Sequence, residues 1–336
     1  MRSFNRRSFI VNTALAGLGA GLLHSLPSLG RSPLRTETGK RIGIIGLDTS
    51  HSEVFTKAIN GGGPEMKGYK VIAAYPHGSK DIPAALKMKP GIIEAVKANG
   101  VEIVDSIEEL IKKVDVVLLE TIDGRPHFEQ ALPVMQAGKR MFIDKPIAAS
   151  LDDVKKIFAT SKKYDAPVFS SSALRFDGNV QKVVSGSIGK VLGADVYTPA
   201  EIESNHMDMA WYAIHGIEML FTVMGPGCKT VTRVYNDGVD FVTGVWEDGR
   251  VGSVRGIRNG ASNIAGTAFG ESGISPLGPF SSYSPLIAEI IGFFETGKPP
   301  VSEKETMEIF SFIKAADLSR KRNGSPVSLS NVQLLK

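Results

Sequence analysis

Short apolar runs alternate with amphipathic segments between Arg41 and Asp165. The runs have the length of buried strands, and each is followed by apolar residues at helical spacing. This alternation is typical of a doubly wound parallel sheet, because parallel neighbours need a helical crossover. We therefore predict strands at 41–47, 69–75, 101–105, 115–121 and 140–143, and helices at 51–60, 92–99, 107–113, 127–137 and 151–164.

A different pattern begins after Ala166. Longer strand candidates lie at 193–198, 230–235, 240–246 and 250–257, which predicts an antiparallel sheet. The stretch 260–278 is rich in glycine and serine and is expected to be loop and strand edge, followed by helices at 284–296 and 304–322. A chain of 336 residues is long enough for about two domains, which we place at 37–165 and 166–336.

Composition excludes several classes of protein. A hydrophobic content of 42% and a charged content of 22% are unlike those of disordered chains, collagen-like fibres and multi-span membrane proteins. The net charge of +4 comes from the first 36 residues, which hold five arginines and no acidic residue. The other 300 residues hold 34 basic and 35 acidic residues, so the body of the chain offers no basic surface for nucleic acid.

The basic segment has the layout of an export signal. Charged residues through Arg7 precede a mostly apolar stretch from Phe9 to Leu23, which is short for a membrane span, and small residues follow. Arg6-Arg7 before Phe9 resembles a twin-arginine signal. We expect residues 1–36 to direct export to the periplasm by the twin-arginine machinery, with no stable membrane anchor after processing; a stray basic terminus is the alternative.

A possible dinucleotide fingerprint lies where the first predicted strand runs into a helix. Gly46 takes the place of its first glycine, whereas Asp48 and His51 stand in place of the second and third. A carboxylate beside a diphosphate is unfavourable unless it turns away or caps the helix. The second strand is followed by no acidic residue before Asp81 that could hold a ribose. The segment alone leaves NAD(P) binding, a non-nucleotide site and plain helix capping open.

Lys145 follows the fifth predicted strand, at the edge of the sheet where ligands bind in open α/β folds. In this context the chain resembles the Gfo/Idh/MocA oxidoreductases over roughly residues 40–330. The motifs that carry the resemblance are Ile143-Asp144-Lys145-Pro146, His127 with Ala137-Gly138-Lys139, Leu174-Arg175-Phe176, Gly186-Ser187-Ile188-Gly189-Lys190-Val191, and His215 in Ile214-His215-Gly216. Asp144 replaces the family's usual Glu, and Trp211 stands where the family commonly has Asp.

The resemblance implies an α/β protein with a Rossmann-type domain and a second α/β domain whose open antiparallel sheet forms homo-oligomer contacts. It also implies hydride transfer between NAD or NADP and a saccharide or polyol, with Lys145 binding the reacting oxygen and His215 exchanging its proton. We expect the substrate near Arg175, Trp211 and Tyr212. We expect the cofactor near Gly46, Asp48, Thr49, Ser50, His51, Tyr75, Thr121, Asp123, His127, Lys145 and Pro146.

Two other functions stay open at this stage. Asp48, His51 and the missing ribose acid favour an enzyme that has lost the dinucleotide and acts on sugars as a lyase, epimerase or hydrolase. A carbohydrate-binding protein without turnover is the third alternative, against which Lys145 and His215 count. The spacing of His206, Asp208, His215 and Glu218 does not by itself indicate a metal, and we expect no metal site.

Overall fold

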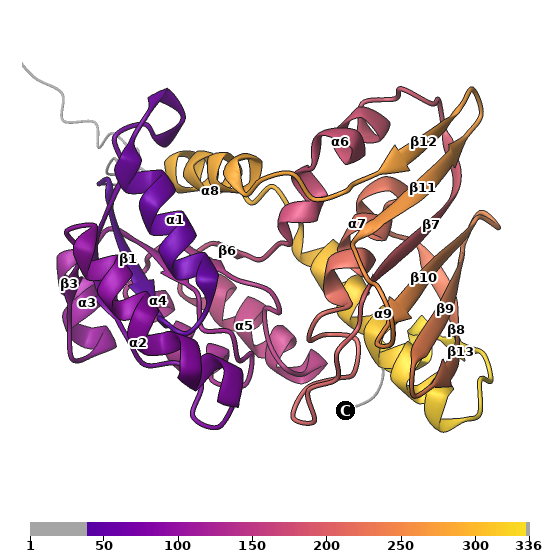
Figure 1. Cartoon of the computed structure of the whole chain (residues 1–336), viewed down its shortest axis with the longest axis horizontal. Helices are drawn as coiled ribbons and strands as arrows, with labels where there is room; N and C mark the ends of the chain where they lie inside the picture. The colour runs from indigo at the N-terminus through magenta and orange to yellow at the C-terminus, as the bar shows by residue number, and fades with distance from the viewer. Residues whose placement is uncertain (1–38, 334–336) are drawn as a thin grey trace, which may run out of the picture. The chain divides into compact units, whose positions relative to one another are not determined.

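The structure is a computed structural model that describes residues 39–333 (Figure 1). The export signal predicted at residues 1–36 lies outside the described residues. The first sheet is parallel throughout and has the order β3-β2-β1-β4-β5-β6. Strands β1 to β3 are added toward one edge of the sheet and β4 to β6 toward the other, so the strand order reverses between β1 and β4. Its strands are β1 (Arg41–Ile45), β2 (Lys70–Tyr75), β3 (Glu102–Ile103), β4 (Val116–Leu119), β5 (Met141–Ile143) and β6 (Val168–Phe169).

The crossovers between these strands are mostly helical, as the sequence predicts. Ser106 and Ser150 cap α3 and α5, since each hydroxyl accepts a hydrogen bond from a backbone N–H of the first turn. The helices are α1 (Ser50–Gly61), α2 (Pro83–Ala98), α3 (Ile107–Lys113), α4 (His127–Gln136) and α5 (Leu151–Lys163). The doubly wound parallel sheet is therefore confirmed.

Two details of the first layer differ from the prediction. Helix α2 begins at Pro83 instead of residue 92, because proline is tolerated in a first turn, and the helix also accommodates Pro90 in its interior. The sheet also has a sixth strand, β6, whose two residues are too few to show a periodic pattern.

Helix α8 (Ser284–Thr296) is far from this layer in sequence but packs against it. Leu286, Ile290 and Phe294 of α8 share one buried cluster with Ile42 of β1 and Phe142 of β5. Figure 1 shows α8 beside α1. Both β6 and α8 lie beyond residue 165, where the sequence placed the end of the first domain. The first layer thus uses chain from both halves of the sequence.

The second sheet is mixed. Its order is β12-β11-β7-β10-β9-β8-β13, and β7 pairs with β10 in parallel whereas the other pairs are antiparallel. The expectation of a wholly antiparallel sheet is corrected here, because β7 precedes a long helical excursion before the chain returns as β8. The strands are β7 (Val191–Pro199), β8 (Cys228–Asn236), β9 (Val239–Trp246), β10 (Val251–Ile257), β11 (Ala265–Gly270), β12 (Ile274–Leu277) and β13 (Val327–Ser328).

Strands β11 and β12 lie within the glycine-rich stretch that the sequence predicted to be loop and strand edge. Their residues pair with β7 and with each other, so this stretch completes the sheet. Shorter helical elements precede β7 and follow the sheet: η2 (Ala173–Phe176), α6 (Gly178–Val184) and α10 (Leu329–Gln333).

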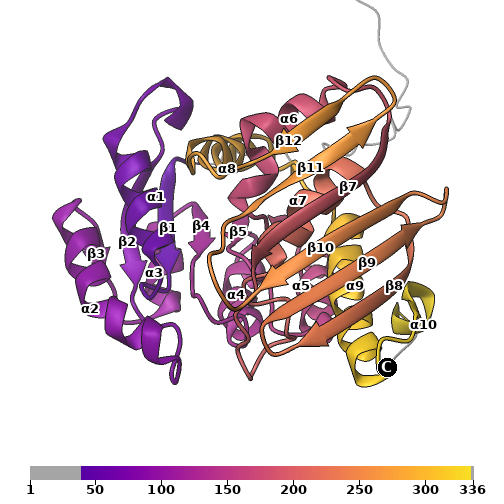
Figure 2. The same cartoon turned by 45° about the vertical axis from the view of Figure 1, so that its right-hand side comes forward.

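One face of the second sheet is covered by helices. Helices α7 (Ile214–Met224) and α9 (Glu303–Lys321) pack against β7, β8 and β10 through buried residues that include Leu220, Phe221 and Phe312. Figure 2 looks onto the opposite face, with these helices behind the strands. Among residues 39–333, no helix has the length and apolar character needed to cross a membrane.

Candidate functional site

The turn after β1 requires glycine. Gly46 has a φ of +88° and donates its N–H to the carbonyl of Tyr75, the last residue of β2. A Cβ at this position would lie 2.6 Å from the backbone nitrogen of Thr121, closer than real Cβ atoms approach. Both the dihedral angle and the lack of space therefore exclude side chains here. This is the turn that the sequence predicted from its strand and helix context.

Asp48 turns away from the helix that follows it. Its carboxylate accepts hydrogen bonds from the backbone N–H of Ser79 (2.6 Å) and Ile122 (3.1 Å), in the loops after β2 and β4. Thr49 instead caps α1, as its hydroxyl accepts from the N–H of His51. Asp48 thus ties three loops together at the carboxyl edge of the sheet, and two N–H donors stabilise its negative charge.

Other residues predicted to bind the cofactor are buried with protein partners. Thr121 donates its hydroxyl to Gln130 (2.8 Å), and the ring nitrogens of His127 lie 2.7 Å and 3.1 Å from the carbonyl oxygens of Thr121 and Ile147. Ser50, at the start of α1, is exposed. A dinucleotide at this edge would therefore meet Ser50 and backbone N–H groups rather than the side chains of Thr121 and His127.

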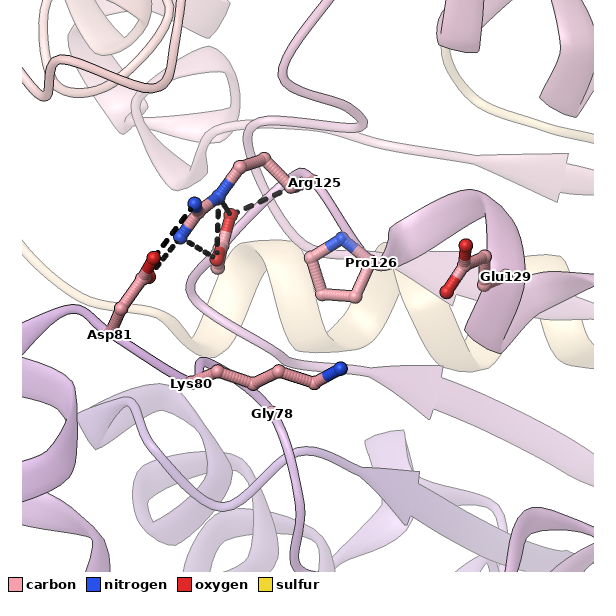
Figure 3. A pocket seen from close by; sticks show the side chains of 7 residues that line it. Gly78, Lys80, Asp81, Arg125, Pro126 and Glu129 are labelled. Atoms are coloured by element: carbon pink, nitrogen blue, oxygen red, sulfur yellow. Dashed lines mark hydrogen bonds and ion pairs between the residues drawn. The ribbon is translucent and has the colours of Figure 1, made fainter.

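A pocket of about 250 Å³ opens beside these loops (Figure 3). The loop after β2 supplies Lys80 and Asp81, and the loop after β4 supplies Asp123 and Arg125. Arg125 forms ion pairs with both aspartates, which raises the pKa of its guanidinium further and neutralises most of the local charge. The pocket has the residues to contact a polar group but contains neither Lys145 nor His215.

Lys145 is the second residue after β5 and precedes Pro146, and only 7% of its surface is exposed. Its ammonium lies over the ring of Tyr212, 5.8 Å from the ring centroid. Among residues 39–333, the ammonium of Lys145 forms no hydrogen bond and no salt bridge. A buried ammonium that forms no hydrogen bond or close ion pair is available for an oxygen atom of a ligand.

His215 lies in the first turn of α7 and also contacts Tyr212. The two rings are 5.5 Å apart, and His215 Nδ1 is 2.7 Å from the hydroxyl oxygen of Ser172. Burial lowers the pKa of His215 well below its usual value, and the charges of Lys145 and His51 lower it further. Its imidazole is therefore neutral at neutral pH and can accept a proton. Lys145 and His215, predicted to act together, are brought to one place.

Arg175 and Trp211 contact other residues. Arg175 is buried in ion pairs with Glu218 (3.2 Å) and Glu305 (2.5 Å), and its Nη2 has no hydrogen-bond partner among the described residues. Trp211 packs on His206 with the ring centroids 4.9 Å apart. Of the three predicted substrate residues, Tyr212 is the one that contacts both Lys145 and His215.

Three residues near Lys145 were not predicted. Ser172 contacts His215 and takes the place of the polar partner that Trp211 does not provide. Glu120 directly follows β4 and is fully buried. The hydroxyl oxygen of Tyr283 lies 3.0 Å from Nε2 of His51, so the two atoms share a hydrogen bond. Glu120 could have been noticed, since it ends the apolar run Val116–Leu119 at the edge where ligands bind. Ser172 and Tyr283 carry no comparable signal, because serine and tyrosine are common in loops.

The residues at the first turn fit a dinucleotide, with one departure. Gly46 gives the tight turn, and the N-terminus of α1 is open at Ser50. The loop after β2 has no acidic residue before Asp81, and Asp81 is paired with Arg125. The pyrophosphate part of a dinucleotide thus has a site here, whereas the usual carboxylate for the adenosine ribose is missing.

Comparison with known proteins agrees with this geometry. A family model described as oxidoreductase family, NAD-binding Rossmann fold (Gfo/Idh/MocA) matches residues 40–172. The chain is 28% identical over 214 residues to myo-inositol 2-dehydrogenase of Thermotoga maritima, which covers 59% of this chain. The match spans 58% of the length of that relative.

Solved structures show the same fold over most of the chain. A probable dehydrogenase from Thermotoga maritima has a TM-score of 0.71 at 20% identity and covers 87% of this chain and 99% of its own. Scyllo-inositol dehydrogenase from Lactobacillus casei with bound NAD(H) and scyllo-inositol has a TM-score of 0.68 at 16% identity, covering 86% and 99%. Residues 40–172 are thus similar to the NAD-binding Rossmann domain of the Gfo/Idh/MocA oxidoreductases, and most of the chain shares its fold with the two solved structures.

Proposed function

We propose that this protein is an NAD(P)-dependent dehydrogenase of a polyol or saccharide. The observation that carries the proposal is the pairing of a buried Lys145 ammonium, which forms no ion pair among the described residues, with a neutral His215 imidazole, both in contact with Tyr212. A hydroxyl group is the substrate that needs both a positive charge beside its oxygen and a base for its proton. The names of the relatives, inositol dehydrogenases, support a cyclic polyol in particular.

Each residue has a separate part in the proposed reaction. Lys145 holds the substrate oxygen and stabilises negative charge that develops on it. With Nδ1–H donating to the hydroxyl oxygen of Ser172, Nε2 of His215 is the nitrogen that accepts the substrate hydroxyl proton. Tyr212 contacts both side chains and gives the apolar face of a sugar ring a surface to pack on. A bound nicotinamide supplies the hydride acceptor.

Alanine substitution tests this assignment. We expect Lys145→Ala and His215→Ala each to lower kcat/KM by about 10²–10⁴ toward the polyol substrate, the range for a positioned acid or base. The double variant should lose less than the sum of the two losses in free energy, since both residues serve one proton transfer. The assay follows NAD(P)H absorbance with myo-inositol, scyllo-inositol and a panel of free sugars.

Lys87→Ala is the matched control, because Lys87 is exposed on α2 and far in sequence from the site. It should retain normal turnover. If Lys145→Ala and His215→Ala also retained normal turnover while melting like the unchanged protein, the proposed site would be wrong.

One observation favours a second candidate function. In it the protein has no dinucleotide and acts as a sugar lyase, epimerase or hydrolase through Lys145 and His215. Asp48 stands in place of the second fingerprint glycine, and its buried carboxylate lies between the loops after β2 and β4. Calorimetry with NAD(H) and NADP(H), and mass spectrometry of the protein purified without nucleotide, distinguish the candidates. Absence of nucleotide in both experiments, combined with turnover of a sugar that depends on Lys145, would favour the second candidate.

We further propose that the protein is exported to the periplasm by the twin-arginine machinery. The proposal rests on Arg6-Arg7 before Phe9 and the apolar stretch after it. Replacing Arg6 and Arg7 by lysine should trap unprocessed precursor in the cytoplasm. Replacing Arg31 and Arg35 by lysine, as a control, should leave processing unchanged; normal processing of both variants would rule out this route.

A further inference from the structure

Three buried side chains from separate elements converge beside Lys145. His51 comes from the first turn of α1, Glu120 from the end of β4 and Asp144 from the end of β5. One nitrogen or oxygen atom from each of them lies within 4.8 Å of the other two. Since β4 and β5 are parallel neighbours paired through Leu119 and Ile143, the next residues of both strands come side by side at the sheet edge.

Three of the four carboxylate oxygens in this cluster lack partners among the described residues. Both side-chain oxygens of Glu120 and Oδ1 of Asp144 are buried without a hydrogen bond to any described residue. Glu120 is 0% and Asp144 1% exposed, so bulk water does not solvate them. Buried polar atoms are normally satisfied, and an unpaired carboxylate is among the most costly groups to bury. Three unsatisfied oxygens at one point therefore call for a group outside the chain.

Protonation alone does not satisfy the cluster. Burial and the neighbouring charge of Asp144 raise the pKa of Glu120 well above its usual value, whereas Lys145 lowers it. A proton on Glu120 would leave its second oxygen and Asp144 Oδ1 still unpaired. A cation with two positive charges would bind all three oxygens and balance both carboxylates at once. Lys145 would then remain free for the substrate oxygen.

The histidine is arranged as metal-binding histidines are. His51 Nδ1 lies 2.7 Å from Asp144 Oδ2, so it faces the cluster, and Nε2 lies 3.0 Å from the hydroxyl of Tyr283. With Nδ1 bound to a metal, Nε2 would donate its proton to the Tyr283 oxygen. Such an outer hydrogen bond fixes the tautomer and the ring orientation of a metal-binding histidine. The stacking of His51 on Phe55, 5.4 Å away, also holds the ring.

We propose that His51, Glu120 and Asp144 bind one divalent transition-metal ion, of the Mn²⁺ or Zn²⁺ class. One imidazole nitrogen with two carboxylates favours these ions, whereas Mg²⁺ and Ca²⁺ prefer sites made of oxygen atoms alone. The ion would connect α1 to the ends of β4 and β5 next to Lys145. It would thereby hold that edge of the sheet in a fixed arrangement around the proposed site.

Metal binding can be measured without any substrate. The full chain is stripped with a chelator and titrated with Mn²⁺, and bound ion is followed by the loss of the free Mn²⁺ signal in electron paramagnetic resonance. Calorimetry then compares Zn²⁺ and Mg²⁺. We expect one Mn²⁺ or Zn²⁺ per chain, at least tenfold weaker binding of Mg²⁺, and a melting temperature that rises with the tighter ions.

Substitutions identify the site. Glu120→Gln keeps the shape of the side chain but removes its charge, and it should weaken Mn²⁺ binding by at least tenfold. Glu108→Gln changes an exposed glutamate on α3 and should bind Mn²⁺ like the unchanged protein. Asp144→Asn is a second variant in case Glu120→Gln folds poorly, and circular dichroism of each stripped variant reports folding.

Two results would overturn the proposal. One is the absence of saturable Mn²⁺ or Zn²⁺ binding by the stripped chain. The other is unchanged binding by folded Glu120→Gln or Asp144→Asn, which would place the ion elsewhere. Because no substrate or nucleotide enters these measurements, their failure leaves the proposed dehydrogenase activity standing, and loss of that activity leaves the metal result standing.

Discussion

At the scale of single residues, the site depends on how His215 is held. Its Nδ1 is 2.7 Å from the hydroxyl of Ser172, which also accepts a weak bond from the N–H of Leu174 (3.3 Å). Ser172 is 1% exposed, so this contact is shielded from water. A hydroxyl in this place fixes the ring plane of His215 and leaves Nε2 as the nitrogen without a partner among the described residues. Ser172 is therefore a positioning residue.

Ser172→Ala should lower kcat about tenfold with little change in KM, because the substrate still binds Lys145 while the base is poorly oriented. Ser172→Thr keeps the hydroxyl and should restore most of the rate. Ser185→Ala, at an exposed serine after α6, is the control and should have no effect. Steady-state kinetics on the three variants is the measurement, and equal kcat for Ser172→Ala and the unchanged protein would remove Ser172 from the mechanism.

The pH dependence of kcat/KM follows from the lowered pKa of His215. The neutral imidazole is the base, and it is the main form above its pKa. Because burial and nearby charges lower this pKa below the ordinary value of about 6.5, kcat/KM should stay constant from pH 8 down through that value and decline only at lower pH. A pH profile in buffers of constant ionic strength checks this, and a decline that begins above pH 7 would contradict it.

At the scale of elements, the turn between β1 and α1 joins the fold to the site. Its glycine could be recognised from the sequence because a strand, a turn and a helix follow one another there. The contacts of Asp48 and His51 could not be predicted from the sequence. Asp48 accepts hydrogen bonds from backbone groups 31 and 74 positions away, and His51 contacts a residue 93 positions away. Such contacts depend on strand order and register, which periodicity does not contain.

Gly46→Ala should lower the free energy of unfolding by about 2 kcal/mol or more, since a positive φ alone costs an alanine about 1–2 kcal/mol and the Thr121 backbone leaves no room for Cβ. It should also abolish NAD(H) binding. Gly292→Ala is the control within α8, where a Cβ meets nothing within 4 Å; it should retain or slightly raise stability. Urea denaturation and calorimetry measure both effects.

The same limit explains which elements could be predicted. The strands with strong apolar runs and the helices with clear caps lie close to their expected positions, because local sequence specifies them. The two-residue strand β6 has no such signal, and the glycines of β11 and β12 resemble those of a loop. The place of α8 beside the first sheet is a matter of tertiary packing, which its amphipathic pattern leaves open.

At the scale of the whole molecule, the candidate site depends on contacts between distant parts of the chain. Lys145 follows β5 of the first sheet. Tyr212 lies just before α7 and His215 in its first turn, and α7 packs on the second sheet. The motifs suggested that Lys145 and His215 act together although 70 positions separate them. The contacts through Tyr212 and Ser172 needed the structure, since neither residue belongs to a recognisable motif.

One face of the second sheet carries no helices (Figure 2). Large hydrophobic side chains on its strands are 37% to 70% exposed: Leu192, Tyr197, Val234, Phe241, Val245, Val251, Phe269 and Ile274. Many exposed large apolar side chains on one sheet are typical of an interface with another protein. We expect it to be the contact between copies of this chain, as the family resemblance implied.

Two lysines in the middle of this face should separate the copies. Val245 and Val251 are directly opposite each other in the pairing of β9 with β10 and are 40% and 48% exposed. Val245→Lys with Val251→Lys would bring two like charges into the same buried contact from each copy, a cost of several kcal/mol. Light scattering after gel filtration should show an oligomer for the unchanged chain and a monomer for the double variant. Val184→Lys is the control, since Val184 is 53% exposed on α6 and should leave the mass unchanged. An unchanged chain that is monomeric at micromolar concentration would show that this face serves another purpose.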